Sequence, residues 1–282
     1  MRVRFCGVRG STPAPGAEFT GIGGHTSCLA VSAGGIAPPR LLLDAGTGLR
    51  TVTSVLGGQP FRGTILLTHV HWDHVQGLPF FAGGDRDDAV VRLLLPNEGV
   101  DAVRQLRRMM SPPHFPIGPE GLRGDWRYEV LDVGRHAIEG LRVTAGEVPH
   151  KGGRTFGYRV EDGSASFAYV PDHLPASSGS PRDAVLELIA GVDVLIHDAQ
   201  FVAAELEVAE AYGHSTVDQA LALAAEANVG QLVLFHHAPG RTDREVDAIA
   251  AACGAGDGRV SAAAEGTTID LAPVGARVSR WR

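Results

Sequence analysis

The chain has 282 residues, is 44% hydrophobic and carries a net charge of −7. These values allow one large domain over residues 1–282 with a full hydrophobic core, and no linker-like stretch divides the chain. A sequence pI of about 5.9 argues against a stable nucleic-acid partner, because affinity for phosphate backbones depends mainly on clustered Lys and Arg.

The first half of the chain predicts strands separated by loops and short helices. The apolar run at 40–45 is typical of a fully buried strand, and the turn G-T-G leads from it into a short helix. The stretch S-P-P-H-F-P-I-G-P-E-G contains too much proline for either regular state. We expect strands at 3–6, 27–32, 40–45, 64–68, 90–95, 128–133 and 141–148, and helices at 49–56 and 99–110.

The second half changes from strands to an alternation of helix and strand. Residues 155–160 and 166–170 form an expected hairpin joined through E-D-G-S, and Ser215 is the expected N-cap of a later helix. We expect helices at 182–190, 216–227 and 243–252, strands at 192–196 and 231–235, and two short strands at the end. This order predicts stacked β-sheets that are covered by outer helices.

Cysteine usage and hydropathy predict the compartment. Cys6, Cys28 and Cys253 form no C-x-x-C pattern, which is typical of a reducing cytoplasm. The start M-R-V-R-F-C-G-V-R-G lacks the apolar centre of a signal peptide, and no apolar run approaches the ~20 residues of a membrane span. We therefore expect a cytoplasmic protein that does not cross a membrane.

The stretch T-H-V-H-W-D-H, residues 68–74, follows a buried strand and concentrates metal-ligand side chains. His69 and His71 are two residues apart, so on an extended segment they point the same way and can bind one cation. Asp73 and His74 follow where the chain is expected to turn into a helix, and a second cation could use them. Imidazole and carboxylate ligands without thiolate suit zinc, manganese or iron.

One segment cannot complete two metal sites, so the other ligands must come from elsewhere in the chain. Several His and Asp residues end apolar runs, where strands would deliver them to a sheet edge. Their convergence on one site is the better interpretation of the pattern. These residues are His150 in E-V-P-H, Asp172 in Y-V-P-D, His197 and Asp198 in V-L-I-H-D, and His236 in V-L-F-H.

Together these motifs resemble the metallo-β-lactamase-fold hydrolase superfamily. T-H-V-H-W-D-H matches its H-x-H-x-D-H signature, and L-L-L-D-A-G-T-G, E-V-P-H, Y-V-P-D and V-L-F-H match its other motifs in order. The resemblance runs from residue 3 to about residue 238 and implies an αββα sandwich of two mixed β-sheets flanked by helices. It also implies a site at the rim between the two sheets.

The resemblance also assigns roles to individual residues. It implies two divalent metal ions, with zinc the expected ion and manganese or iron able to use the same ligands. His69, His71 and His150 would bind the first ion, Asp73, His74 and His236 the second, and Asp172 would bridge them. Asp44 would orient the site, His237 is a rival of His236, and the role of His173 is open.

The stretch Y-G-H-S-T-V-D-Q-A-L resembles the H-S-T motif of the ribonuclease Z-like phosphodiesterase branch. In that branch the motif histidine, here His214, contacts the scissile phosphate and helps the leaving oxygen depart. A carboxylate in an upstream H-E-A segment steadies it, and here the segment is H-D-A, so Asp198 is one methylene shorter. The implied reaction is attack on phosphorus by a metal-bridged hydroxide, with Asp73 as a proton acceptor and His214 as the general acid.

The chain departs from ribonuclease Z itself. Bacterial enzymes of that kind carry a long tRNA-grasping arm, whereas His150 and Asp172 are only 22 residues apart, which leaves room for one hairpin. We therefore expect a small phosphodiester substrate, a cyclic nucleotide in particular, and a possible homodimer. The alternatives are tRNA 3′-end processing, a lactonase- or thioesterase-type hydrolase, and a sensor that binds without turnover. Residues 107–119 could form a lid or a dimer-contributed wall over the site, with an ordinary surface loop as the alternative, so the role of the 107–127 loop is open.

Overall fold

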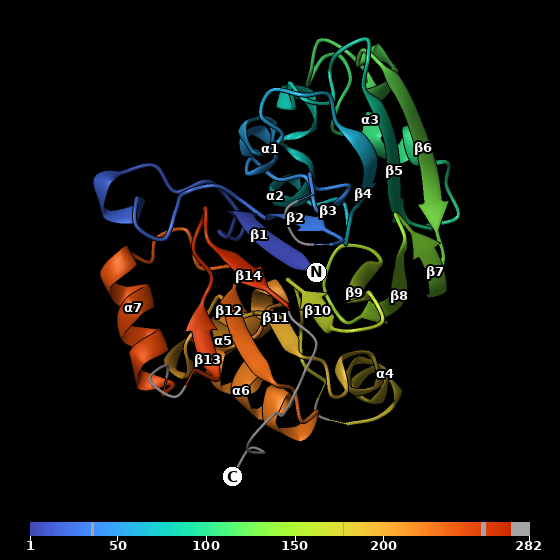
Figure 1. Cartoon of the computed structure of the whole chain (residues 1–282). Helices are drawn as coiled ribbons and strands as arrows, with labels where there is room; N and C mark the ends of the chain where they lie inside the picture. Colours follow the sequence, from blue (N-terminus) through green and yellow to red (C-terminus); the bar gives the residue numbers. More distant parts are fainter. Residues whose placement is uncertain (35–36, 177, 255–257, 272–282) are drawn as a thin grey trace.

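The structure is a computed structural model that describes residues 1–34, 37–176, 178–254 and 258–271. It contains two seven-stranded sheets that stack face to face, with helices on their outer faces (Figure 1). Both sheets are mixed, because each joins a parallel part to an antiparallel part. This arrangement confirms the predicted αββα sandwich.

The first sheet has the strand order β14-β1-β2-β3-β4-β5-β6. Strands β3 to β6 run parallel, whereas β14, β1, β2 and β3 pair antiparallel. Its strands are β1 (Arg2–Gly7), β2 (Cys28–Ser32), β3 (Leu41–Leu43), β4 (Arg62–Leu66), β5 (Val90–Pro96), β6 (Asp125–Leu131) and β14 (Thr268–Asp270).

The second sheet has the order β13-β12-β11-β10-β9-β8-β7. Strands β10 to β13 run parallel, so the segments that follow β10, β11 and β12 emerge at one edge of the sheet. Its strands are β7 (Gly134–Ile138), β8 (Leu141–Val148), β9 (Thr155–Glu161), β10 (Ser166–Val170), β11 (Val194–Asp198), β12 (Gln231–Phe235) and β13 (Val260–Ala262).

Helices cover the outer face of each sheet. Side chains of α1 (Leu49–Val55), α2 (Trp72–Val75) and α3 (Ala102–Arg107) join the core outside the first sheet. Side chains of α4 (Ser180–Ile189) and α6 (Val217–Glu226) do the same for the second. The other helical segments are α5 (Leu206–Tyr212), α7 (Asp243–Ala252), η1 (Ala17–Phe19), η2 (Leu78–Phe80), η3 (Pro119–Gly121) and η4 (Ala203–Glu205).

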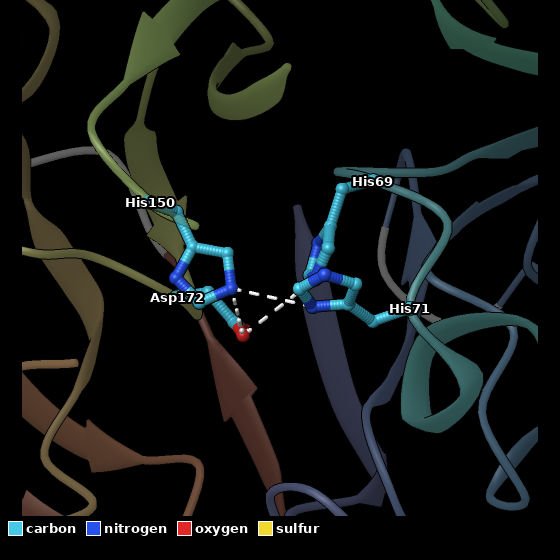
Figure 2. Close-up of side chains that lie close together, drawn as sticks. All are labelled: His69, His71, His150 and Asp172. Atoms are coloured by element: carbon cyan, nitrogen blue, oxygen red, sulfur yellow. Dashed lines mark hydrogen bonds and ion pairs between the residues drawn. The ribbon is translucent and has the colours of Figure 1, made fainter. Parts of the chain in front are cut away.

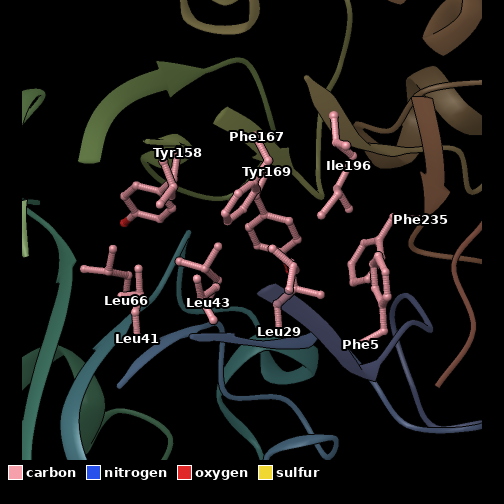
Figure 3. Close-up of a cluster of buried hydrophobic side chains, with 14 of the residues drawn as sticks. Phe5, Leu29, Leu41, Leu43, Leu66, Tyr158, Phe167, Tyr169, Ile196 and Phe235 are labelled. Carbon is pink, nitrogen blue, oxygen red and sulfur yellow. The ribbon is translucent and has the colours of Figure 1, made fainter. Parts of the chain in front are cut away.

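The alternation of side chains along each strand divides the core into layers. Leu41 and Leu43 pack between the two sheets, whereas Leu42 packs under the helices of the first sheet. The layer between the sheets is rich in aromatic side chains, including Tyr169 and Phe235, whose ring centroids are 5.5 Å apart (Figure 3). Strands buried on both faces explain the continuous apolar runs of the sequence.

Local features differ from the expectation in a few places. Thr216, and not Ser215, is the N-cap of α6, and it forms a capping box with Gln219. Strand β6 begins three residues earlier than expected, and β7 and α5 were not expected at all. Among the described residues, no helix has the length and apolar character needed to cross a lipid bilayer.

Two polar residues fix loops in this fold. Arg9 is fully buried, and its guanidinium donates to the carbonyls of Gly23 at 2.7 Å and Arg241 at 2.6 Å. In the β9–β10 turn, the Asp162 carboxylate accepts hydrogen bonds from the amide and hydroxyl of Ser164. Partial burial raises the pKa of Asp162, but these bonds outweigh burial and hold it well below its usual value.

Candidate metal centre

The candidate ligands lie where strands of both sheets end. His69 follows β4, and His71 is the N-cap of α2 in the first half of the molecule. His150, Asp172 and His236 follow β8, β10 and β12 in the second half. Figure 2 shows His69 and His71 on one side and His150 and Asp172 on the other, with their polar atoms turned toward one another.

One group of side chains consists of His69, His71, His150 and Asp172, whose ligand atoms all lie within 4.8 Å of one another. His150 Nε2 is 3.3 Å from His71 Nδ1. Asp172 Oδ2 is 3.4 Å from His150 Nε2 and 3.6 Å from His69 Nε2. Three imidazoles and one carboxylate oxygen therefore surround a single point.

Asp73, His74 and His236 form a second group beside the first. His236 Nε2 and His74 Nε2 lie 3.1 Å and 3.4 Å from Asp73 Oδ2. Asp172 Oδ1 lies 3.0 Å from His74 Nε2 and 3.3 Å from His236 Nε2. The two oxygens of Asp172 thus face different histidine groups, which is the geometry of a bridging carboxylate.

The chemistry of both groups fits divalent cations. His69 Nε2, His74 Nε2 and Asp172 Oδ1 are buried without a hydrogen-bond partner in the part of the chain that the structure describes. Such atoms carry a large desolvation penalty unless another partner, such as a cation, satisfies them. Nitrogen and carboxylate ligands in these numbers suit zinc, and equally manganese or iron.

The charges around His74 also fit a cation. Burial lowers the pKa of His74, but the carboxylates of Asp172, Asp73 and Asp44 outweigh burial and raise it well above its usual value. Burial lowers the pKa of His69, whose ring is therefore neutral, as a metal ligand must be. The second group has an excess of negative charge that a divalent cation would balance.

Contacts behind the histidines fix the orientation of their rings. The Asp44 carboxylate accepts hydrogen bonds from His74 Nδ1 at 2.8 Å, from the Thr68 amide at 2.7 Å and from the Tyr169 hydroxyl at 2.9 Å. His150 Nδ1 donates to the Gly213 carbonyl at 2.7 Å. In each ring one nitrogen is held from behind while the other is directed into the cluster.

Gln200 and Ser11 also belong to this layer of contacts. His236 Nδ1 donates to Gln200 Oε1 at 2.9 Å, and Gln200 Nε2 donates to Ser11 Oγ at 3.1 Å. The Ser11 amide donates to Asp73 Oδ2 at 2.6 Å. Sequence reasoning missed Gln200, although it follows the H-D-A segment directly.

His214 lies beside the cluster and is held by Asp198. His214 Nδ1 is 3.0 Å from Asp198 Oδ2 and 4.0 Å from Asp172 Oδ2. Asp198 therefore reaches His214, although its side chain is one methylene shorter than the glutamate of the H-E-A segment. Burial lowers the pKa of His214, but the charge and hydrogen bond of Asp198 outweigh burial and raise the pKa to about 9.

Two neighbouring histidines lie outside both groups. His237 Nε2 donates to the Ala263 carbonyl at 3.0 Å, whereas His236 lies within the second group. His173 Nδ1 lies 3.0 Å from His197 Nε2, behind the site. The geometry thus favours His236 over His237 as the candidate metal ligand. The neighbour of His173 is the buried His197.

The cluster opens into a hollow of about 650 Å³. Ser11, Asp73, Asp172 and His214 contribute polar atoms to its lining, and Trp72 and Tyr212 contribute aromatic rings. A hollow of this size next to a polar cluster can hold a small organic ester together with a water molecule.

Comparisons with known proteins agree with this geometry. Residues 39–237 match the family model described as the Beta-lactamase superfamily domain. The chain is 29% identical to ribonuclease Z of Bradyrhizobium diazoefficiens, over 80% of this chain and 88% of that protein.

Two solved structures share the fold. The metallo-beta-lactamase fold protein YhfI from Bacillus subtilis aligns with a TM-score of 0.71 at 18% identity, over 95% of this chain and 99% of that chain. A diphosphatase from the PhnP family aligns with a TM-score of 0.68 at 19% identity, over 97% of this chain and 99% of that chain.

Proposed function

The chain belongs to the beta-lactamase superfamily of metal-dependent hydrolases, and we propose that it is a dinuclear-metal phosphodiesterase acting on a small phosphodiester, in particular a cyclic nucleotide. The observation that carries the proposal is the position of His214. It is held by Asp198 at 3.0 Å, beside the carboxylate of Asp172 whose two oxygens face both histidine groups. A hydrolase of esters with good leaving groups would not need a protonated imidazole there.

We assign the ligands as follows. His69, His71 and His150 would hold one divalent ion, Asp73, His74 and His236 the other, and Asp172 both. Zinc is the expected ion for this set, with manganese or iron as alternatives. When bound, these ions supply Lewis acidity, which lowers the pKa of water and neutralises charge on the phosphate oxygens.

Side chains of the protein accept and donate the protons of the proposed reaction. The oxygen of a water molecule forms a bond to phosphorus as the bond from phosphorus to the leaving oxygen breaks. We assign to Asp73 the acceptance of a proton from that water and to His214 the donation of a proton to the leaving oxygen. Asp198 keeps His214 oriented and charged, because its Oδ2 accepts the Nδ1 proton.

The structure between His150 and Asp172 supports a small substrate. That segment contains only the short hairpin of β9 and β10, without an inserted arm for grasping tRNA. The net charge of −7 also disfavours long RNA. Ribonuclease Z as a relative supports a phosphodiester bond as the target, and endonuclease activity on precursor tRNA is the second candidate.

The proposed compartment and oligomeric state rest on less specific features than the proposed reaction. Cys6, Cys28 and Cys253 are all free thiols, which supports a reducing compartment such as the cytoplasm. A homodimer is also part of the proposal, as an expectation from the family resemblance.

The deciding experiment compares leaving groups. Protein loaded with Zn or Mn is given a panel of cyclic nucleotides, whose leaving group is an alkoxide, and bis(p-nitrophenyl) phosphate, whose leaving group needs no proton. We expect His69→Ala to abolish both reactions, and His214→Ala to slow the cyclic nucleotides by roughly 10²–10⁴-fold while slowing the nitrophenyl ester much less. His136→Ala, on β7, serves as the histidine control.

Each alternative gives a different result. Equal slowing of both substrate classes by His214→Ala would refute the general-acid role. Hydrolysis of lactones or thioesters that is independent of His214, without phosphodiester cleavage, would identify a different hydrolase. Cleavage of precursor tRNA but of no cyclic nucleotide would favour the second candidate, and metal binding without any hydrolysis would identify a sensor.

A further inference from the structure

A second hollow adjoins the metal centre and shares one side chain with it. This hollow, of about 500 Å³, lies between the α2–η2 segment and residues 108–115. Trp72 lines both this hollow and the hollow over the metal centre. The two spaces are therefore neighbours, and a substrate that occupies the first can extend past Trp72 into the second.

Trp72 is unusually exposed for an indole at a buried site. It occupies the first position of α2, between His71 and Asp73, and yet its side chain is 72% exposed. An exposed tryptophan gains little from the core of its own protein, since its flat apolar surface remains in water. Its position at the edge of a candidate active site suits stacking against a planar ring of the substrate.

The rest of the second hollow is lined mainly by apolar side chains, with Gln76 and His114 as polar residues and Arg108 as a permanent positive charge. Phe80 and Phe115 meet edge to face, with ring centroids 5.9 Å apart, and Met109 adds a thioether. Among the described residues, none with a carboxylate lines this hollow. Arg108 lines it and makes no ion pair or side-chain hydrogen bond with any residue in the described part of the chain.

The preceding residue, Arg107, differs from Arg108 because its guanidinium is paired. Arg107 Nε donates to Glu120 Oε1 at 3.0 Å, which links α3 to η3. Ser111 Oγ donates to the Arg107 carbonyl at 2.6 Å and adds a second tie. Arg108 itself is exposed and lines the hollow, so its charge is available for an anion.

His214 determines which part of a substrate would enter the second hollow. It follows α5 by two residues and lines the metal-centre hollow beside Tyr212 and Phe201. A proton from His214 must reach the leaving oxygen, so the leaving group lies toward α5. In an in-line displacement the attacking water lies opposite the leaving oxygen, and the group that stays on phosphorus projects sideways. We place that group toward Trp72, because Trp72 lines both hollows.

From these observations we infer that the second hollow is a subsite for a nucleoside that remains attached to the reacting phosphorus, with its base stacked on Trp72 and a second phosphate of the same nucleotide bound by Arg108. The inference rests on the proposed phosphodiesterase and narrows its substrate to nucleotides with at least two phosphates, such as a cyclic dinucleotide or a short oligonucleotide. A cyclic mononucleotide has no second phosphate for Arg108.

Three synthetic esters with the same leaving group test the subsite. They are methyl p-nitrophenyl phosphate, thymidine 5′-(p-nitrophenyl phosphate), and the latter with a 3′-phosphate added. In metal-loaded wild type we expect kcat/KM to rise along this series. Trp72→Ala should lower the preference for thymidine over methyl roughly fivefold or more, and Trp72→Phe should retain part of it.

Arginine variants test the second phosphate separately. Arg108→Ala should remove the decrease in KM that the 3′-phosphate provides, without changing the preference for thymidine over methyl. Arg104→Ala removes an exposed arginine from α3, the helix that Arg108 caps at its C-terminus, and should change neither ratio. Ratios equal to those of wild type in both Trp72→Ala and Arg108→Ala would overturn the subsite.

A binding measurement keeps the subsite testable if no ester is hydrolysed, an outcome that would refute the proposed reaction. Calorimetric titration with thymidine 3′,5′-bisphosphate then compares wild type with Trp72→Ala and Arg108→Ala. Affinity that falls in both variants would support the subsite, and absent or unchanged affinity would refute it.

Discussion

Substitution of Asp44 by asparagine tests how the histidines of the centre are held. Asp44 is fully buried and has a φ of +59°, a conformation that asparagine tolerates better than most residues. The Asp44→Asn variant would therefore keep the backbone but could present only one acceptor oxygen. The Thr68 amide and the His74–Tyr169 pair approach opposite oxygens of the carboxylate, so one side must lose its acceptor.

The expected magnitude follows from these contacts. The less damaging orientation leaves the Thr68 amide unsatisfied, at about 1–3 kcal/mol, and weakens the bond from His74 because the acceptor is now neutral. We expect the free energy of unfolding to fall by roughly 2–4 kcal/mol in metal-free protein. Affinity for the metal should fall roughly 10–100-fold, because His74 loses its charged partner.

Urea unfolding of chelator-treated protein measures the first quantity, and competition with a chromophoric chelator measures the second. Asp87→Asn, at an exposed position, is the matched control. Asp44→Ala should destabilise the protein further, since alanine is strained at positive φ. Metal affinity within twofold of wild type in Asp44→Asn would refute the view that this carboxylate positions the centre.

Three other substitutions test separate parts of the structure. In Asp198→Asn, His214 loses its charged partner. We expect the rate of hydrolysis to fall at least tenfold more for substrates with an alkoxide leaving group than for nitrophenyl esters. An equal decrease for both classes in steady-state assays would contradict the role of Asp198 in supporting His214. Arg9→Met should lower the free energy of unfolding in urea by about 3–5 kcal/mol, whereas Arg2→Met, at an exposed ion pair, should change it by less than about 1 kcal/mol. The folded-state pKa of Asp162 is lowered, so its stabilisation is present above about pH 4 and is lost as the pH falls further. Acid titration of the unfolding free energy should therefore show a smaller loss for Asp162→Asn, and an equal loss would exclude the contribution.

The candidate metal ligands were easier to recognise in the sequence than the residues that orient them. The candidate ligands are His and Asp side chains, and several of them follow apolar runs that become buried strands, so residues such as His150 and His236 stood out. Gln200 did not stand out, because an amide that orients a histidine has no characteristic spacing. Only the assembled fold brings it 2.9 Å from His236.

Two structural features were not predictable from pattern alone. Helix α5 exposes Leu206, Val208 and Tyr212, so it lacks the one-sided apolar periodicity that marks a surface helix. The burial of Arg9 does not follow from the sequence pattern, because arginine is rarely buried. Arg9 is buried because carbonyl groups from loops far apart in the sequence converge on its guanidinium, a convergence that depends on the tertiary structure.

The division of ligands between the two sheets links the centre to the core. Each histidine group takes two side chains from the 69–74 segment, which follows the first sheet, and one histidine from the second sheet. Asp172, which faces both groups, follows β10, where Tyr169 packs against Phe235 between the sheets and donates its hydroxyl to Asp44. The distance between the two halves of the centre is therefore set by this aromatic packing, because protein interiors are too closely packed to adjust continuously. We therefore expect substitutions in the layer between the sheets to change metal affinity at the candidate centre even when they touch no candidate ligand.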